Sequence, residues 1–202
     1  MAHTIKYIEA IPLTMMFRED LAPHLVRSGL LAFKNRMTLY RVELEGGFVG
    51  YGDGMGEAQD ASVFVGADAI AGLRTIQHGG VQMALYDAVG KALDVPAHAL
   101  MGRQVRTRIA LGYWTAEVPP DVLARHAAEA ASVGYKVYKT KCRPWWDPVA
   151  QVEAAAAAIG DSGLRLWLDF NGHLRDSRQA IQVLEELSRH DCVAGFESPI
   201  PQ

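Results

Sequence analysis

The chain has few cysteines and no long apolar run. Cys142 and Cys192 are its only cysteines and lie 50 positions apart, so the sequence holds no disulfide framework. We therefore expect a reducing, cytoplasmic setting. No stretch approaches the roughly 18 consecutive apolar residues of a membrane span. The first residues also lack the basic start and apolar stretch of a signal peptide.

The chain also has little net charge. Its 23 acidic and 20 basic residues give a net charge of −3 and a pI near 6.2. This balance gives no electrostatic reason to expect nucleic acid or an anionic membrane as a partner. Half of the 202 residues are apolar and 21% are charged, so the chain can bury one large core or two small ones.

The N-terminal half predicts an antiparallel meander followed by a helix. Strands are expected over 5–13 and 37–45, with a tight turn at Gly46-Gly47 and a return over 48–51. Residues 14–35 show no clear period and predict a long loop that is either functional or mobile. Two further features are a flexible stretch predicted by Gly50, Gly52, Gly54 and Gly56, and a helix predicted over 82–93 by its apolar spacing.

From Arg108 onward the pattern changes to alternating strands and helices. Proline and aspartate mark two of the helix starts, and glycine follows two of the helix ends. This order implies a parallel sheet with helical crossovers. We therefore divide the chain into an α+β domain over 1–104 and a second domain over 105–202. The expected strands are 109–114, 136–141, 164–170 and 193–197, and the expected helices are 119–132, 148–159 and 177–190.

Three polar signals end successive strands of the second domain. They are Lys139-Thr140-Lys141, Asp169-Phe170-Asn171 and Glu197-Ser198-Pro199. Lys141 and Asp169 are 28 positions apart, as are Asp169 and Glu197. That is about one strand–helix unit of a parallel barrel, whose eight units take roughly 250 residues. Two lysines and two carboxylates are therefore expected at the same end of adjacent strands.

Each signal alone also has a simpler interpretation. Lys139 and Lys141 share a face of their strand, where they can be solvated, or can repel so that one becomes a base. Asp169 and Asn171 suit a hard cation, but Asp-x-Asn is also common in turns and caps. Glu197 can be a salt-bridge partner. Their common place at strand ends, where barrel enzymes carry their active sites, favours the catalytic interpretation.

The sequence resembles the enolase superfamily, in its mandelate racemase and muconate lactonizing enzyme branch. The resemblance covers nearly the whole chain and is specific for the branch rather than for a substrate. It implies an α+β N-terminal capping domain followed by the first half of a modified TIM-type (β/α) barrel, truncated at about the fourth barrel strand. The matching stretches are 134–141, 167–171, 196–199 and the helix over 82–93.

The resemblance also implies chemistry that depends on Mg²⁺. Asp169 and Glu197 match the first two of three carboxylates that hold the ion. Lys141 matches the base that abstracts the proton α to a substrate carboxylate, and Lys139 would lower its pKa and contact that carboxylate. The product of this step is an enediolate, which the ion stabilises. The third ligand and the opposing acid or base would lie beyond Gln202, so these 202 residues alone are expected to be inactive.

Other residues have weaker signals. Asn171 and His173 follow Asp169 on the same alternation and can face the substrate, although His173 can equally cap backbone. Tyr51 lies in the glycine-rich stretch that folds over the substrate in the family. Three residues after the lysine strand either shape a pocket or pack their loop against the cap: Arg143, Trp145 and Trp146.

The leading interpretation is an acid-sugar dehydratase whose partner is a small-molecule carboxylate substrate. A racemase or cycloisomerase of a carboxylate is the alternative, and a catalytically incomplete fragment that acts only through assembly is a third. We expect a homo-oligomer with no nucleic-acid or membrane partner. A phosphate-binding α/β enzyme would need a glycine-rich loop opening a helix, and none follows these strands.

Overall fold

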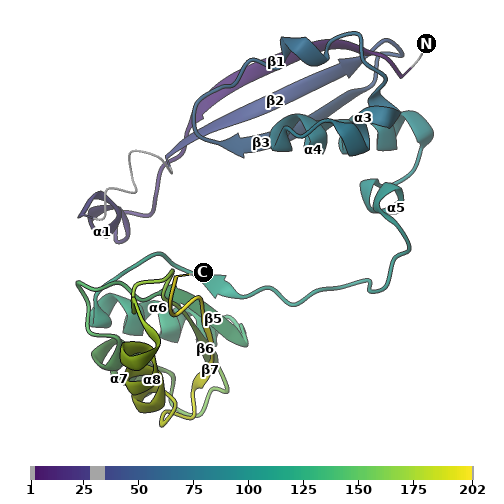
Figure 1. The fold of residues 1–202 in the computed structure, drawn as a ribbon. Coiled ribbons are helices and arrows are strands. Elements are labelled where there is room, and N and C mark those ends of the chain that lie inside the picture. The colour runs from purple at the N-terminus through teal and green to yellow at the C-terminus, as the bar shows by residue number, and fades with distance from the viewer. Residues whose placement is uncertain (1–2, 28–34, 202) are drawn as a thin grey trace. The chain divides into compact units, whose positions relative to one another are not determined.

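The computed structural model describes residues 3–27 and 35–201 (Figure 1). They form two compact units, each with its own hydrophobic core. The first unit is Met1–Arg18 with Val26–Arg108, and the second is Glu19–Leu25 with Ile109–Gln202. The chain thus changes unit after Arg108 rather than after residue 104, and a short N-terminal segment belongs to the second unit.

The first unit is built on a three-stranded antiparallel sheet in the order β1-β2-β3 (Figure 1). Its strands are β1 (Ile5–Thr14), β2 (Arg36–Leu44) and β3 (Val49–Met55). The predicted meander is therefore confirmed. Alternate residues of β2 face the core, as the pleat requires. These buried residues are Thr38, Tyr40, Val42 and Leu44.

The glycines of β3 allow a helix to lie directly against the strand. Helix α4 (Gly79–Leu93) packs on β3. A Cβ at Gly50 would lie 2.0 Å from the backbone oxygen of Ala84, and one at Gly52 would lie 2.2 Å from that of Gly80. The predicted flexible stretch is thus wrong over most of its length, because these glycines serve close backbone packing rather than mobility.

Short helices complete the first unit and the loop after β1. Helix α4 begins three residues earlier than predicted, since the His78 ring accepts a hydrogen bond from Val81 N at 3.3 Å and so caps its start. Part of the expected loop over 14–35 is helical, and residues 28–34 lie outside the described residues. No helix of the described chain is long and apolar enough to cross a membrane. The short elements are α1 (Ala22–Arg27), the 3-10 helix η1 (Ser62–Phe64), α3 (Ala69–Thr75) and α5 (Ala97–Met101).

The second unit alternates strands and helices and forms a four-stranded parallel sheet in the order β4-β5-β6-β7 (Figure 1). This confirms the predicted parallel sheet with helical crossovers. The strands are β4 (Tyr113–Trp114), β5 (Val137–Lys141), β6 (Arg165–Asp169) and β7 (Val193–Glu197). The helices are α6 (Pro120–Ser132), α7 (Pro148–Ile159) and α8 (Ser177–Leu187).

The two faces of this parallel sheet differ in character. Tyr138, Leu166 and Leu168 are fully buried and belong to one apolar cluster with Leu123 of α6 and Val152 of α7. Because side chains alternate along a strand, the residues between them point to the opposite face. That face carries polar and aromatic groups: Lys139, Lys141, Trp167 and Asp169.

Two predicted elements are shorter than expected. Strand β4 has two residues, and Ile109 and Leu111 before it are 78% and 75% exposed. Pairing with β5 begins only at Tyr113, so the preceding apolar residues have no strand partner. Helix α8 ends at Leu187 rather than His190. Ser188 closes it, because its hydroxyl donates to the carbonyl of Leu184 at 2.6 Å.

A buried histidine fastens the segment Glu19–Leu25 to the second unit. His126 of α6 is 1% exposed, and its Nε2 lies 2.9 Å from Oδ2 of Asp20. Its Nδ1 lies 3.0 Å from the Tyr113 hydroxyl. The ring of His24 also meets the edge of Trp146, with centroids 6.3 Å apart. The segment is therefore held by polar and aromatic contacts at two points.

Candidate functional site

The strand register brings the three predicted signals to one level of the sheet. Lys141 of β5 pairs with Asp169 of β6, and Asp169 pairs with Glu197 of β7. Lys139 lies two residues earlier on the same face as Lys141. The predicted alignment of these strand ends is confirmed, while the roles of the side chains stay predictions.

The lysines and carboxylates at these strand ends contact one another directly. Nζ of Lys139 donates to both carboxylate oxygens of Glu197, at 2.8 and 2.7 Å, and lies 3.3 Å from Oδ2 of Asp169. Nζ of Lys141 donates to the same Asp169 oxygen. Two cations and two anions therefore form one charge-balanced cluster.

Hydrogen bonding sets the protonation of this cluster. Burial acts to raise the pKa of Asp169, but hydrogen bonds from Lys141, from the Asn171 amide and from Lys139 outweigh it, so the pKa lies below its usual value. The hydrogen bond to Glu197 raises the pKa of Lys139. Burial acts to lower the pKa of Lys139, but this hydrogen bond outweighs it.

The two carboxylates fit part of a site for a hard cation. Asp169 and Glu197 converge on one point, since the same Lys139 nitrogen touches an oxygen of each. Carboxylate oxygens are the ligands that Mg²⁺ prefers in proteins. Among the residues that the structure describes, no group of three or more His, Cys, Asp or Glu side chains could hold a metal ion. The described residues thus offer two carboxylates at this point, and their role as metal ligands stays a prediction.

Asn171 and His173 do not continue the alternation of β6, which ends at Asp169. Asn171 adopts a left-handed conformation with φ 46°, and its backbone N donates to Oδ1 of Asp169 at 3.0 Å. The predicted shared face is therefore wrong, although Asn171 does support Asp169 through its backbone. His173 lines a pocket with Arg143 on the loop after β5. Substrate roles for both residues stay predictions.

Tyr51 lies in the first unit, on β3. Its backbone N donates to Oδ2 of Asp87 at 3.0 Å, and Nζ of Lys91 lies 5.7 Å from its ring centroid. The side chain is 47% exposed. Its local partners are thus residues of α4, and its role toward a substrate stays a prediction.

Sequence reasoning missed Trp167. Its Nε1 donates to Oε2 of Glu197 at 2.9 Å, so it helps to orient that carboxylate, and its strand partner on β7 is Gly195. A Cβ at Gly195 would lie 2.8 Å from the Trp167 ring, which shows how closely the indole covers β7. The alternation of β6 contained this signal, because Trp167 is two residues before Asp169.

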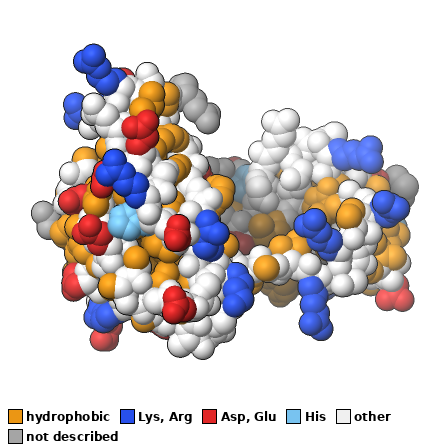
Figure 2. All heavy atoms as spheres, turned by 90° about the horizontal axis from the view of Figure 1, so that it is seen from below, with side chains coloured by type: hydrophobic (Ala, Val, Ile, Leu, Met, Phe, Trp, Pro, Cys, Tyr) orange, Lys and Arg blue, Asp and Glu red, His pale blue; other side chains and the backbone are white. Residues whose placement is uncertain are grey.

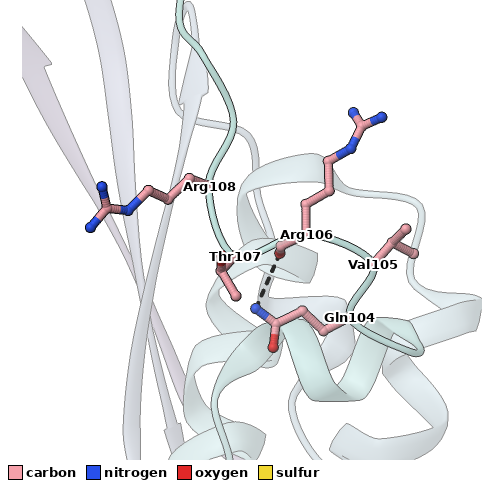
Figure 3. Close-up of a pocket in the computed structure, with 5 residues that line it drawn as sticks. All are labelled: Gln104, Val105, Arg106, Thr107 and Arg108. Atoms are coloured by element: carbon pink, nitrogen blue, oxygen red, sulfur yellow. Dashed lines mark hydrogen bonds between the residues drawn. The ribbon is translucent and has the colours of Figure 1, made fainter.

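A hollow on the segment after α5 offers no comparable chemistry. It has a volume of about 450 Å³ and is lined by the five consecutive residues 104–108. Figure 3 shows the guanidinium groups of Arg106 and Arg108 pointing away from each other. The one hydrogen bond drawn there runs from Gln104 Nε2 to the backbone oxygen of Arg106, at 3.1 Å. No acid or base converges with these groups.

The charged side chains on the surface are also not concentrated in one place. In Figure 2 acidic and basic side chains are scattered over the visible face, with uncharged surface between them. That face shows no continuous basic stripe of the kind that follows a nucleic-acid backbone. The absence of a nucleic-acid partner stays a prediction.

Comparison with known proteins finds relatives that are enzymes, although no protein-family model matches the chain. A D-galactonate dehydratase of Pectobacterium atrosepticum is 28% identical over 117 residues, which cover 54% of this chain and 30% of that protein. A hydrophobic dipeptide epimerase of Enterococcus faecalis is 27% identical over 185 residues, which cover 73% of this chain and 50% of that protein. The matched residues thus span between 30% and 50% of the length of these relatives.

Solved structures share the fold. A mandelate racemase/muconate lactonizing family protein from Azoarcus sp. EbN1 matches with a TM-score of 0.71 and 24% identity, over 98% of this chain and 56% of that one. A dipeptide epimerase of Enterococcus faecalis, complexed with Mg and the dipeptide L-Leu-L-Tyr, matches with a TM-score of 0.73 and 18% identity. That match covers 100% of this chain and 62% of the epimerase chain.

Proposed function

Because the chain belongs to the mandelate racemase and muconate lactonizing branch of the enolase superfamily, we propose that it carries part of the active site of a Mg²⁺-dependent enzyme. The reaction is abstraction of the proton α to the carboxylate of a small-molecule substrate. The observation that carries the proposal is the single register line of Lys141, Asp169 and Glu197, with Lys139 touching both carboxylates. The four-stranded parallel sheet is then part of a (β/α) barrel.

Asp169 and Glu197 would hold the ion, together with ligands from outside this pair. When bound, Mg²⁺ supplies positive charge that stabilises the negative charge developing on the substrate carboxylate. The Mg-complexed epimerase that shares this fold supports the choice of ion. The convergence of the two carboxylates on one point supports the choice of ligands.

Lys141 would take the proton at its Nζ. Its Nζ donates to Oδ2 of Asp169, so it lies at the level of the two carboxylates that would hold the ion. Lys139 would remain charged, because its bond to Glu197 raises its pKa, and would attract the substrate carboxylate.

Among substrates we favour an acid sugar that undergoes dehydration. Racemisation, epimerisation or cycloisomerisation of another carboxylate is the alternative, and the named relatives include both a dehydratase and an epimerase. Both reactions begin with the same proton abstraction. The choice depends on residues that act after that step, on the leaving hydroxyl or on the opposite face of the carbon.

The test is exchange of the substrate α-proton in D₂O, which proton NMR measures. The reaction contains the whole protein, Mg²⁺ and one member of a panel of acid sugars and dipeptides. We expect Lys141→Ala to abolish exchange by at least about 100-fold, since positioned general bases contribute that much. Lys136→Ala is the matched control, because Lys136 is exposed at the other end of the same strand. Full exchange in Lys141→Ala would show that the base is another group.

The charge balance of the cluster favours one other reading, a catalytically incomplete fragment. The four charged side chains satisfy one another, and the described residues offer no third carboxylate. Calorimetric titration of the 202-residue chain with Mg²⁺ separates the two readings. Binding that Asp169→Asn removes supports the metal site, whereas no binding to this chain with full exchange in the whole protein identifies an incomplete site.

A further inference from the structure

A second pocket lies between the loop after β5 and the loop after β6. Its volume is about 390 Å³, within the range of small-molecule sites. The walls include the indoles of Trp145 and Trp146 and the ring of Phe170. Arg143 and His173 add polar groups to this apolar lining. The pocket thus combines aromatic surface with a cation.

This pocket lies on the face of the sheet opposite to the lysines. Its lining includes Cys142 and Phe170, which follow Lys141 and Asp169 by one residue each. Successive side chains along an extended strand point to opposite faces. Cys142 and Phe170 accordingly belong to the apolar cluster between sheet and helices. The pocket is therefore separate from the proposed catalytic face.

Arg143 of the pocket forms an ion pair with the buried Glu117, and most donors and acceptors of this pair have no hydrogen-bond partner among the described residues. The Glu117 side chain is 1% exposed, and its Oε2 lies 3.7 Å from Nε of Arg143. Neither carboxylate oxygen of Glu117 accepts a hydrogen bond from a described residue. The Arg143 side chain is 12% exposed and donates no hydrogen bond to the described chain. A largely buried guanidinium without hydrogen bonds is costly unless an acceptor completes it, and a carboxylate is such an acceptor.

We propose that this pocket binds a small organic anion, a carboxylate carried on an aromatic or aliphatic body, through the guanidinium of Arg143. Arginine presents a planar set of donors that matches a carboxylate in a bidentate manner. The indoles of Trp145 and Trp146 and the Phe170 ring supply the apolar surface for the body of the ligand. The site would act independently of the proposed proton abstraction.

Two charged or titratable groups near Arg143 bear on an anionic ligand. Glu117 lies 3.7 Å from Nε of Arg143, so its negative charge opposes an anion, while the terminal nitrogens of the guanidinium have no hydrogen-bond partner among the described residues. His173 contributes no competing negative charge. Burial, followed by the charge of Arg143, lowers the pKa of His173, so its ring is neutral at pH 7 and can exchange a hydrogen bond with the ligand.

The experiment is isothermal titration calorimetry of the 202-residue chain, in EDTA, with phenylacetate and with its neutral isostere phenylacetamide. We expect phenylacetate to bind with a dissociation constant of about 1 mM or tighter. Phenylacetamide should bind at least about tenfold more weakly, because it lacks the charge that Arg143 recognises. Acetate, which has the charge without the ring, should also bind more weakly.

Variants locate the site. Arg143→Gln should remove the preference for the acid over the amide, and Arg143→Lys should keep part of it. Glu117→Gln should tighten phenylacetate about threefold or more, because it removes a buried like charge behind the guanidinium. Arg178→Gln is the matched control, an exposed arginine on α8 next to the pocket residue Gln179. It should leave both affinities unchanged.

Three outcomes would overturn the proposal. They are no measurable phenylacetate binding, equal affinities for the acid and the amide, and an unchanged preference in folded Arg143→Gln. Loss of phenylacetate binding in Lys141→Ala would also contradict it, since the anion would then lie on the lysine face. None of these measurements needs Mg²⁺, so they are independent of the α-proton exchange assay.

Discussion

Cys142 illustrates how its surroundings set the chemistry of one side chain. The thiol is 3% exposed, and burial, followed by the charge of Asp169, raises its pKa to about 12. With a pKa of about 12, only about one Cys142 thiol in 10⁴ is ionised at pH 8. The thiolate is the reactive form, so Cys142 should react slowly. Cys142 is thus a packed residue, although it lies beside the proposed base.

We predict that iodoacetamide at pH 8 leaves Cys142 unmodified in the native protein and modifies it in urea. Peptide mapping by mass spectrometry measures both. The raised folded pKa has a consequence for stability: the contribution of this group is present below the unfolded thiol pKa of about 8.5 and is lost as the pH rises toward 12. Cys192, which is half-buried, is the internal comparison, and native labelling of Cys142 as fast as that of Cys192 would contradict the prediction.

Strand β3 and helix α4 depend on each other through two glycines. We predict that Gly50→Ala destabilises the protein by about 3 kcal/mol or more, because its Cβ would lie 2.0 Å from a backbone oxygen that cannot rotate away. Gly54→Ala on the same strand is the control. Its Cβ would meet only a Tyr40 ring atom at 3.8 Å, so a cost below about 1 kcal/mol is expected. Urea unfolding followed by circular dichroism measures both, and equal costs would argue against the close contact.

The segment Glu19–Leu25 is a second element held by few contacts, of which the pairing of Asp20 with His126 is the buried one. We predict that Asp20→Ala raises amide hydrogen exchange across this segment, because His126 Nε2 loses its carboxylate in a buried site, at a cost of about 1–3 kcal/mol. Glu129→Ala is the control, since that carboxylate lies 3.9 Å from the other ring nitrogen and is 44% exposed. Unchanged exchange in Asp20→Ala would mean that apolar contacts alone hold the segment.

At the scale of the whole molecule, two separate apolar clusters imply two separate unfolding events. We predict that Leu166→Ala, in the second core, lowers the protection of α7 amides and leaves that of α4 unchanged. Gly50→Ala should do the reverse. Leucine-to-alanine changes in a core cost about 2–5 kcal/mol, which is ample for detection by hydrogen exchange. A parallel loss of protection in both helices would show that the units unfold together.

The sequence predicted the parts of the fold that local patterns encode. Spacing of 28 residues located the three strand ends, and the register of Lys141, Asp169 and Glu197 agrees with it. Asp147 and Pro148 predicted the start of α7, where the Asp147 carboxylate does accept from Val149 N at 2.9 Å. Such signals are readable because capping and alternation involve near neighbours in the chain.

Tertiary contacts explain the failures. The glycines of β3 predicted a flexible stretch because the helix that packs on them, α4, begins only at Gly79, far along the chain. Asn171 was expected to continue the strand because the neighbouring sequence gives no signal that β6 ends at Asp169. Glu117 and Arg143 follow two different strands, β4 and β5. No pattern within either segment predicts that they pair.

The charge balance of the strand-end cluster couples two ligands. Lys139 and Lys141 already neutralise Asp169 and Glu197, so the proposed divalent cation would leave two surplus positive charges there. The carboxylate of the proposed substrate would remove one of these two charges. Cation and substrate should therefore strengthen each other's binding, by the same factor in both directions. Each of the two ligands would then be bound more tightly in cells that also supply the other.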